Sequence, residues 1–204
     1  VDGTAVQNIV ITITGVNDIA VISGNNEGGV TEDASNPTLS TSGNLAITDT
    51  DAGEAVFSTS VDGVDTPLGN LTIDASGAWN YTLDNTLAAV QQLPEGAQLV
   101  DKFEVESFDG ETTETITVTI TGVNDVPVFG GDTQGQVTED DNTTLSTSGT
   151  LTINDVDTGE SLVDTSVSSG VTLGSLTVDS NGAWTYTVDN SLDDIQALVD
   201  GEQI

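Results

Sequence analysis

The sequence repeats itself at an offset of 105 to 107 residues, and this repetition constrains its fold more than any other feature. Val-Thr-Glu-Asp at residues 30–33 returns at 137–140, and Gly-Ala-Trp-x-Tyr-Thr at 77–82 returns at 182–187. Self-similarity at a fixed period is typical of a tandem array of like units. We therefore predict consecutive copies of one small domain.

The repeat pattern divides the chain into three segments. Residues 1–17 align with the end of the following copy, so we predict that they are the C-terminal strand of a preceding repeat. Residues 18–124 are expected to be a complete repeat, and residues 125–204 a partial repeat that lacks its last strands, since counterparts of residues 100–124 are missing. Such a sandwich would have an unpaired edge. We interpret the third segment as a fragment; the alternative is that the 1–17 strand of another chain completes it.

Within a repeat, apolar and polar residues alternate with a period of two. Ile116, Val118 and Ile120 share one side of a predicted strand, and threonines occupy the other side. This alternation is typical of an antiparallel sheet with one buried face. About seven such strands in each copy predict an all-β fold: tandem immunoglobulin- or cadherin-like β-sandwich repeats of about 105 residues, stacked end to end.

Two local patterns refine this prediction. Trp79 and Tyr81, like their counterparts Trp184 and Tyr186, share strand parity with apolar neighbours. We expect them in the core, since such rings bury much area, rather than on an exposed platform that stacks on sugars. A spacing of three at Leu87, Val90 and Leu93, and again at Leu192, Ile195 and Leu198, predicts two short helices behind Asn or Ser caps.

Charge and composition exclude several functions. Thirty-four acidic residues against one basic residue, Lys102, give a net charge of −33, which repels nucleic acids and anionic membranes. The absence of Cys, His and Met removes thiol nucleophiles, histidine bases and ordinary zinc sites. No apolar run approaches the roughly 20 residues that cross a bilayer, so membrane insertion is not expected in this segment. The Thr-, Asp- and Gly-rich composition favours an extracellular location.

The acidic residues gather in loops that recur in each repeat. Asp-x-Asp-x-Gly-Glu occupies residues 49–54 and 155–160, and an Asn-Asp pair ends Thr-Gly-Val-Asn-Asp at both 14–18 and 121–125. Asp, Asn and Gly favour turns for backbone reasons alone, but close carboxylates repel by about 1 kcal/mol per pair even in water. Ca²⁺, which takes about 6–8 oxygen ligands, would relieve that repulsion. The predicted metal ligands are Asn17, Asp18, Glu32, Asp49, Asp51, Glu54, Asp109, Asn124, Asp125, Glu139, Asp155, Asp157 and Glu160.

These motifs stand in the order of the calcium motifs of cadherin repeats. The Gly-Ala-Trp hairpin and the Thr-Gly-Val-Asn-Asp ending more closely resemble the VCBS-type, cadherin-like tandem repeats of giant bacterial RTX-type adhesins. The resemblance covers the whole chain and implies secreted, calcium-stiffened extender modules that hold an adhesive tip away from the cell. It implies two junction sites, one with Asn17, Asp18, Asp49, Asp51 and Asp109, and one with Glu32, Asn124, Asp125, Asp155 and Asp157. The junctions lack the full acid-x-Asn-Asp-Asn of animal cadherins.

From these observations we predict a calcium-stiffened spacer of a cell-surface adhesin, active in cell adhesion or biofilm attachment, with neighbouring repeats of the same polypeptide as partners. Two alternatives are a glycan-binding β-sandwich module and a fibre or lattice subunit that assembles by strand donation. An enzyme is not expected. A glycosidase needs one carboxyl with a raised pKa in a sheltered cleft, whereas these acids lie in repeated, Gly-flanked loops.

Overall fold

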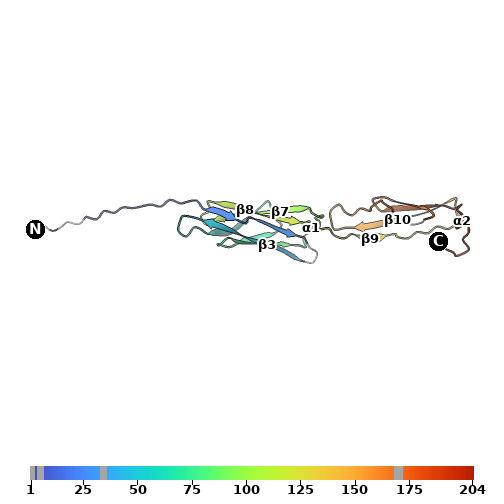
Figure 1. Cartoon of the computed structure of the whole chain (residues 1–204), viewed down its shortest axis with the longest axis horizontal. Helices are drawn as coiled ribbons and strands as arrows, with labels where there is room; N and C mark the ends of the chain where they lie inside the picture. Colours follow the sequence, from blue (N-terminus) through green and yellow to red (C-terminus); the bar gives the residue numbers. More distant parts are fainter. Residues whose placement is uncertain (1–2, 4–6, 33–35, 168–171) are drawn as a thin grey trace. The chain divides into compact units, whose positions relative to one another are not determined.

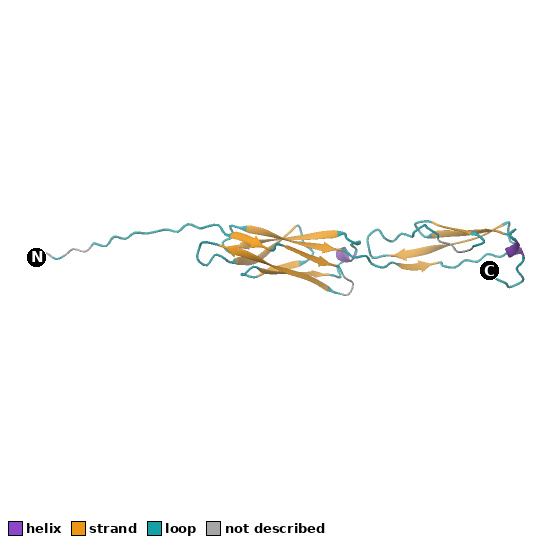
Figure 2. Ribbon diagram, viewed as in Figure 1, coloured by secondary structure: helices purple, strands orange, loops and turns teal. Residues whose placement is uncertain are grey.

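The computed structural model describes residues 3, 7–32, 36–167 and 172–204. Asp33 and most of the first six residues, which belong to motifs discussed above, lie outside this range. The described residues form strands and two one-turn helices (Figure 2), so the all-β prediction is confirmed. Neither helix in the described part has the length or the apolar character to cross a membrane.

The first sheet of the complete repeat has the strand order β1-β3-β6-β5, with all pairs antiparallel. Its strands are β1 (Val21–Gly24), β3 (Thr38–Thr48), β5 (Asn70–Ile73) and β6 (Ala78–Asp84). The β5–β6 hairpin turns at residues 74–77. The backbone N–H of Ser76 donates to Asp74 Oδ1 at 2.8 Å, and Gly77 has a φ of 90°, which glycine adopts without strain.

The second sheet has the order β2-β8-β7-β4. Its strands are β2 (Glu27–Thr31), β4 (Phe57–Val64), β7 (Gln98–Ser107) and β8 (Thr113–Thr121). The chain passes from the first sheet to the second between β1 and β2, where Gly24 has a φ of 115°. Over its described residues, the complete repeat has eight strands, β1 to β8, rather than about seven.

The core of this repeat lies between its two sheets. Trp79 and Tyr81 are 1% and 0% exposed, and the ring of Tyr81 meets Phe103 edge to face with centroids 5.9 Å apart. The Tyr81 hydroxyl donates to Oδ2 of the buried Asp101 at 2.7 Å. The prediction that the aromatic residues belong to the core, rather than to a sugar-binding platform, is confirmed for this repeat, and Trp184 is also buried.

The following repeat forms one sheet, with the order β11-β12-β10-β9. Its elements are β9 (Val128–Gly131), β10 (Thr144–Asn154), β11 (Ser175–Val178), β12 (Ala183–Asp189) and the helix α2 (Asp193–Gln196). Among its described residues, no strand corresponds to β2 or β4, because those strands pair with β8 and β7, whose counterparts the sequence does not contain. One face therefore stays open: Leu176 is 42% exposed, whereas its counterpart Leu71 is 4% exposed.

The chain forms two compact units, and Figure 1 labels some strands of each, such as β3 and β10. The first contains Val1–Val30, Pro37–Asp84 and Leu99–Ile120, and the second contains Thr31–Asn36, Asn85–Gln98 and Thr121–Ile204. The second unit thus includes Glu32 and the helix α1 (Ala88–Gln91) from the complete repeat. This grouping matters for the acidic residues, because each cluster described below lies within a single unit.

Two expectations differ from the structure. Residues 7–20 form no strand, so the strand expected near residues 9–14 is not present here, and its assignment to a preceding repeat stays a prediction. The short helices form as predicted, but their N-caps are Leu87 and Leu192, without a capping side chain. The expected Ser cap is wrong because Ser191 Oγ donates to Asp189 Oδ1 instead.

Candidate metal centres

The first acidic cluster lies in the first unit and joins three loops, at residues 17–18, 49–54 and 109–111. Asp49, Glu54 and Asp109 each place a carboxylate oxygen within 4.8 Å of the other two. Backbone donors hold the loop in shape: Asp51 N–H donates to Asp49 Oδ1, and Asp18 N–H donates to Asp51 Oδ2, both at 2.7 Å. A hydrogen bond therefore joins the segment at residues 17–18 to the Asp-x-Asp loop at residues 49–54.

The Asn17 amide completes this cluster as a hydrogen-bond donor. Its Nδ2 donates to Asp109 Oδ2 at 3.1 Å and to Glu111 Oε2 at 3.2 Å. Hydrogen bonds from Ser107 and Asn17 lower the pKa of the Asp109 carboxyl below its usual value. Burial, followed by the charges of Asp51 and other nearby acids, raises the pKa of Glu54. Sequence reasoning missed Glu111, although its position two residues after Asp109 matches the spacing of Asp49 and Asp51.

The second cluster, in the second unit, repeats the backbone hydrogen bonds of the first. Asp155, Asp157 and Glu160 place carboxylate oxygens within 4.8 Å of one another. Asp157 N–H donates to Asp155 Oδ1 at 2.9 Å, and Asp125 N–H donates to Asp157 Oδ2 at 2.8 Å. Burial and the charges of Asp157 and Asp155 raise the pKa of the Asp125 carboxyl.

Glu32 comes to the second cluster from the complete repeat. It is 3% exposed, and its Oε2 accepts a hydrogen bond of 3.2 Å from the backbone N–H of Val123. Burial raises the pKa of Glu32, the Val123 N–H lowers it, and the nearby charges of Asp125 and Asp157 raise it again. The net effect is a pKa above the usual value, caused first by burial and then by the negative charges nearby.

The clusters contain carboxylate oxygens with unmet hydrogen-bonding capacity. Among the described residues, four buried side-chain atoms lack any hydrogen-bond partner: Asp49 Oδ2, Glu54 Oε2, Asp125 Oδ2 and Asp157 Oδ1. All four belong to the two clusters, and Asp157 is only 2% exposed. A buried, unpaired carboxylate oxygen is costly unless a proton or cation satisfies it. A donor set that consists of oxygens alone fits Ca²⁺.

Comparison with known families decides what kind of chain carries these clusters. The family of the bacterial cadherin-like domain matches residues 17–122, which is just over half of the chain and includes the whole first cluster. The chain belongs to the bacterial cadherin-like domain family. Residues 124–199, which include most of the second cluster, match the bacterial Ig domain family. Cadherin-like and Ig-like domains are non-catalytic structural modules, and cadherin-like domains generally bind calcium.

Solved structures similar to this cadherin-like chain include extracellular domains of protocadherins. Protocadherin gammaB4 is 20% identical, with 91% of this chain and 29% of that chain covered and a TM-score of 0.48. Protocadherin gammaB7 EC3–6 is 18% identical, with 88% and 41% covered and a TM-score of 0.46. The D00–D0 domain of intimin is 12% identical, with 84% and 87% covered and a TM-score of 0.31. This chain spans less than half the length of the protocadherin chains, and no curated protein matches it.

The cadherin-like clusters bring together twelve of the thirteen predicted ligand residues. Asn124 shares one local hydrogen bond with Asn17, since each amide donates to the backbone carbonyl of the following aspartate. Glu139, the counterpart of Glu32, is half-buried, and no hydrogen bond of the described residues joins it to either cluster. The assignment of individual ligands stays a prediction.

Proposed function

We propose that this bacterial cadherin-like chain is a calcium-stiffened spacer, or extender, in a large secreted or cell-surface adhesin of the VCBS and RTX type. In this proposal it supports cell adhesion or biofilm attachment and has no enzymatic activity. The observation that carries it is the presence of four buried, unpaired carboxylate oxygens, all in the two clusters. Calcium would satisfy those oxygens.

The second cluster supports a stiffening role because it draws residues from two consecutive repeats. Glu32 belongs to the complete repeat, while Asp125, Asp155 and Asp157 follow its last strand, and all four lie in one compact unit. Without a cation, these carboxylates repel one another, and the single basic residue of the chain cannot neutralise them. An ion held by both repeats acts as a cross-link between them.

The expected affinity favours a location outside cells. Extracellular calcium modules bind with dissociation constants of about 10⁻⁴–10⁻³ M. Sites of this affinity are filled in calcium-rich surroundings and empty where free calcium is low. With an affinity in this range, the chain would be flexible during export, when its sites are empty, and stiffer outside the cell, when calcium fills them.

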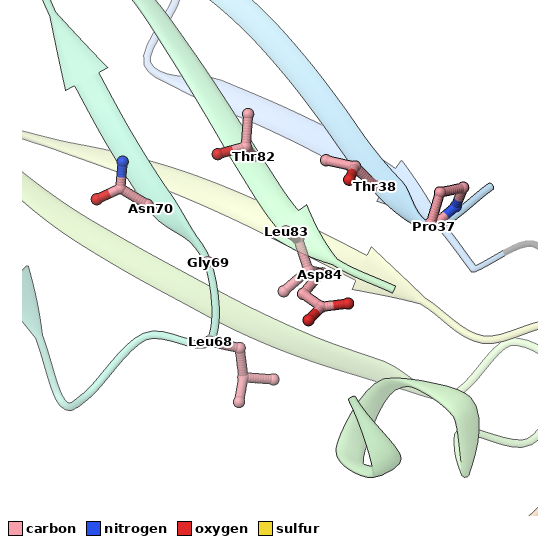
Figure 3. Close-up of a pocket in the computed structure, with 8 residues that line it drawn as sticks. All are labelled: Pro37, Thr38, Leu68, Gly69, Asn70, Thr82, Leu83 and Asp84. Carbon is pink, nitrogen blue, oxygen red and sulfur yellow. The ribbon is translucent and has the colours of Figure 1, made fainter. Parts of the chain in front are cut away.

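The glycan-binding alternative has little support among the described residues. A pocket of about 560 Å³ opens beside β5 and β6 (Figure 3). It is lined by Pro37, Thr38, Leu68, Gly69, Asn70, Thr82, Leu83 and Asp84. None of these residues is aromatic, and Trp79 and Trp184 are buried, so this pocket offers no surface on which a sugar ring could stack.

The proposal is tested by the melting temperature and the maximum dimension from small-angle X-ray scattering, measured in EGTA and then in millimolar Ca²⁺. We expect calcium to raise the melting temperature, because it binds the folded state, and to narrow the distribution of dimensions. Millimolar Mg²⁺ serves as the control, since it demands a tighter octahedral geometry and should have a smaller effect. Equal values of both quantities in EGTA and calcium would overturn the proposal.

A further inference from the structure

An amide relay connects the helix α1 to Glu32. Gln91 Nε2 donates to Glu32 Oε1 at 3.1 Å and to Asn85 Oδ1 at 3.3 Å. The Asn85 amide in turn donates to the backbone carbonyl of Asn36 at 2.8 Å. The Gln91 side chain is therefore held in place by a buried neighbour while it contacts the carboxylate.

Glu32 depends on such neutral donors because it is buried and, in the described part of the chain, no basic side chain pairs with it. Gln91 supplies a donor to one carboxylate oxygen, and the backbone N–H of Val123 supplies a donor to the other. A carboxylate has about four lone-pair positions, so these two hydrogen bonds fix its orientation and still leave lone pairs for a metal ion.

The C-terminal end of α1 also contacts the Asp-x-Asp loop of the second cluster, at residues 155–160. The carbonyl of Gln92, the C-cap of the helix, accepts a hydrogen bond of 3.1 Å from the backbone N–H of Thr158. Thr158 follows Asp157 directly, so the last turn of α1 contacts both parts of the second cluster. It holds Glu32 through a side chain and the 155–160 loop through a carbonyl.

We propose that Gln91 is a positioning residue for the second metal centre, which orients Glu32 so that its carboxylate binds calcium together with Asp125 and Asp157. This inference rests on the proposed function, because it assumes that the cluster binds calcium. Partners outside the ligand set that orient metal ligands commonly change metal affinity by about 10–100-fold when removed.

The chain contains a matched control for this proposal. Gln196 occupies the equivalent position in α2, where its Nε2 donates to the carbonyl and to Oδ1 of Asn190, at 2.8 and 3.2 Å. Asn190 is the counterpart of Asn85, so the amide pair recurs. Among the described residues, however, Gln196 has no hydrogen bond to Glu139, the counterpart of Glu32. Its removal should perturb the helix without changing a metal ligand.

The test is calcium titration calorimetry of the full chain carrying Asp49→Asn and Asp109→Asn, which silence the first cluster. In that background, Gln91→Met keeps the side-chain length but removes the donor, and we expect calcium binding to weaken by about 10-fold. Gln196→Met should leave the affinity unchanged. In a Glu32→Gln background, Gln91→Met should cause no further loss, because its effect passes through Glu32. Tb³⁺ luminescence lifetimes in H₂O and D₂O should report more metal-bound water in Gln91→Met.

The outcomes separate the two proposals. If the unmodified chain binds no calcium, the proposed function fails and this inference fails with it. If the chain binds calcium, but the Gln91→Met variant has the same calcium affinity and the same number of metal-bound waters as the chain with Gln91, then only this inference is wrong. A Gln91→Met effect of the same size with and without Glu32 would also contradict it, since the residue would then act only on general stability. The melting temperature in EGTA checks that each variant is folded.

Discussion

The backbone N–H of Asp125 donates a hydrogen bond of 2.8 Å to Asp157 Oδ2, and the other oxygen of the same carboxylate is buried without a partner. Asp18 and Asp51 form the equivalent bond at 2.7 Å in the first cluster. In each cluster, a backbone N–H therefore helps to orient the Asp-x-Asp loop. The loop is pre-shaped, and its remaining oxygens are available to a cation.

Replacing Asp157 should have opposite effects with and without calcium. In EGTA, Asp157→Asn removes one of several close negative charges, and relief of about 1 kcal/mol corresponds to a rise in melting temperature of about 2–4 °C in a chain of this size. In millimolar Ca²⁺ the same change removes a predicted ligand, and the melting temperature should fall below that of the unmodified chain. Differential scanning calorimetry in both buffers measures the two shifts.

The control for this prediction is Asp62→Asn. Asp62 is exposed on β4 and lies outside both clusters, yet its replacement changes the net charge by the same amount. Its effect should be small and should have the same sign in both buffers. Shifts of one sign for Asp157→Asn in EGTA and in calcium would contradict the assignment of this residue to a metal centre.

The pH dependence of stability should also change sign with calcium. Burial, together with nearby acids, raises the pKa of Glu32, Glu54 and Asp125 above their ordinary values of 4.5 and 3.8. A carboxyl with a raised pKa in the folded state adds stability that is fully present below its unfolded pKa and is lost as pH rises through its folded pKa. Lowering the pH from 7 to 5 in EGTA should therefore raise the melting temperature.

In saturating calcium the same acidification should lower the melting temperature. Protons compete with the metal for the carboxylates, so calcium affinity falls with pH. Thermal melts at half-unit pH steps in the two buffers check both slopes. Parallel slopes in EGTA and in calcium would show that these carboxyls do not bind the metal.

Tyr81 should resist ionisation while the protein is folded. Burial raises the pKa of its hydroxyl above the usual value of 10.0, and the hydrogen bond to Asp101 raises it further. Stability should therefore decline as the pH rises above about 10, where the unfolded tyrosine ionises. In a Tyr186→Phe variant, the absorbance at 295 nm reports Tyr81 alone. We expect it to rise only together with the tryptophan fluorescence change of unfolding; a rise near pH 10 in folded protein would contradict this.

Gly43 should be intolerant of a side chain. It pairs with Trp79 across β3 and β6, and a Cβ at this position would overlap the indole ring. We expect Gly43→Ala to lower the free energy of unfolding by about 1–3 kcal/mol, as overpacked cores do. Urea denaturation followed by fluorescence measures this loss. Gly15→Ala is the control, because nothing lies within 4 Å of a Cβ there, and equal stability of both variants would refute the packing argument.

Local patterns in the sequence were sufficient to predict strands such as β6 and β8. Side-chain direction in a strand has a period of two. The alternation of apolar residues and threonines that ends at Ile120 therefore indicates which side of β8 is buried, and the position of Trp79 indicates the same for β6. The repeated Asp-x-Asp-x-Gly-Glu loops likewise predicted where carboxylates gather. In each case the information lies within a few consecutive residues.

The parts that could not be predicted depend on contacts between distant segments. Gln91 resembles any polar helix residue, and its partner Glu32 lies 59 residues away. The signal that could have indicated it is its recurrence as Gln196, six residues after an equivalent Asn. The single sheet of the second copy likewise follows from which strands pair, since β2 and β4 take their partners from β8 and β7.

The most direct test of the metal proposal is a high-resolution crystal structure of this chain grown with millimolar calcium. We expect density for a cation between Asp125 and Asp157, with carboxylate oxygens at about 2.3–2.6 Å and about 6–8 ligands in total. Ordered water hydrogen-bonded to Asp157 Oδ1 at ordinary distances, with no cation in either cluster, would contradict the account.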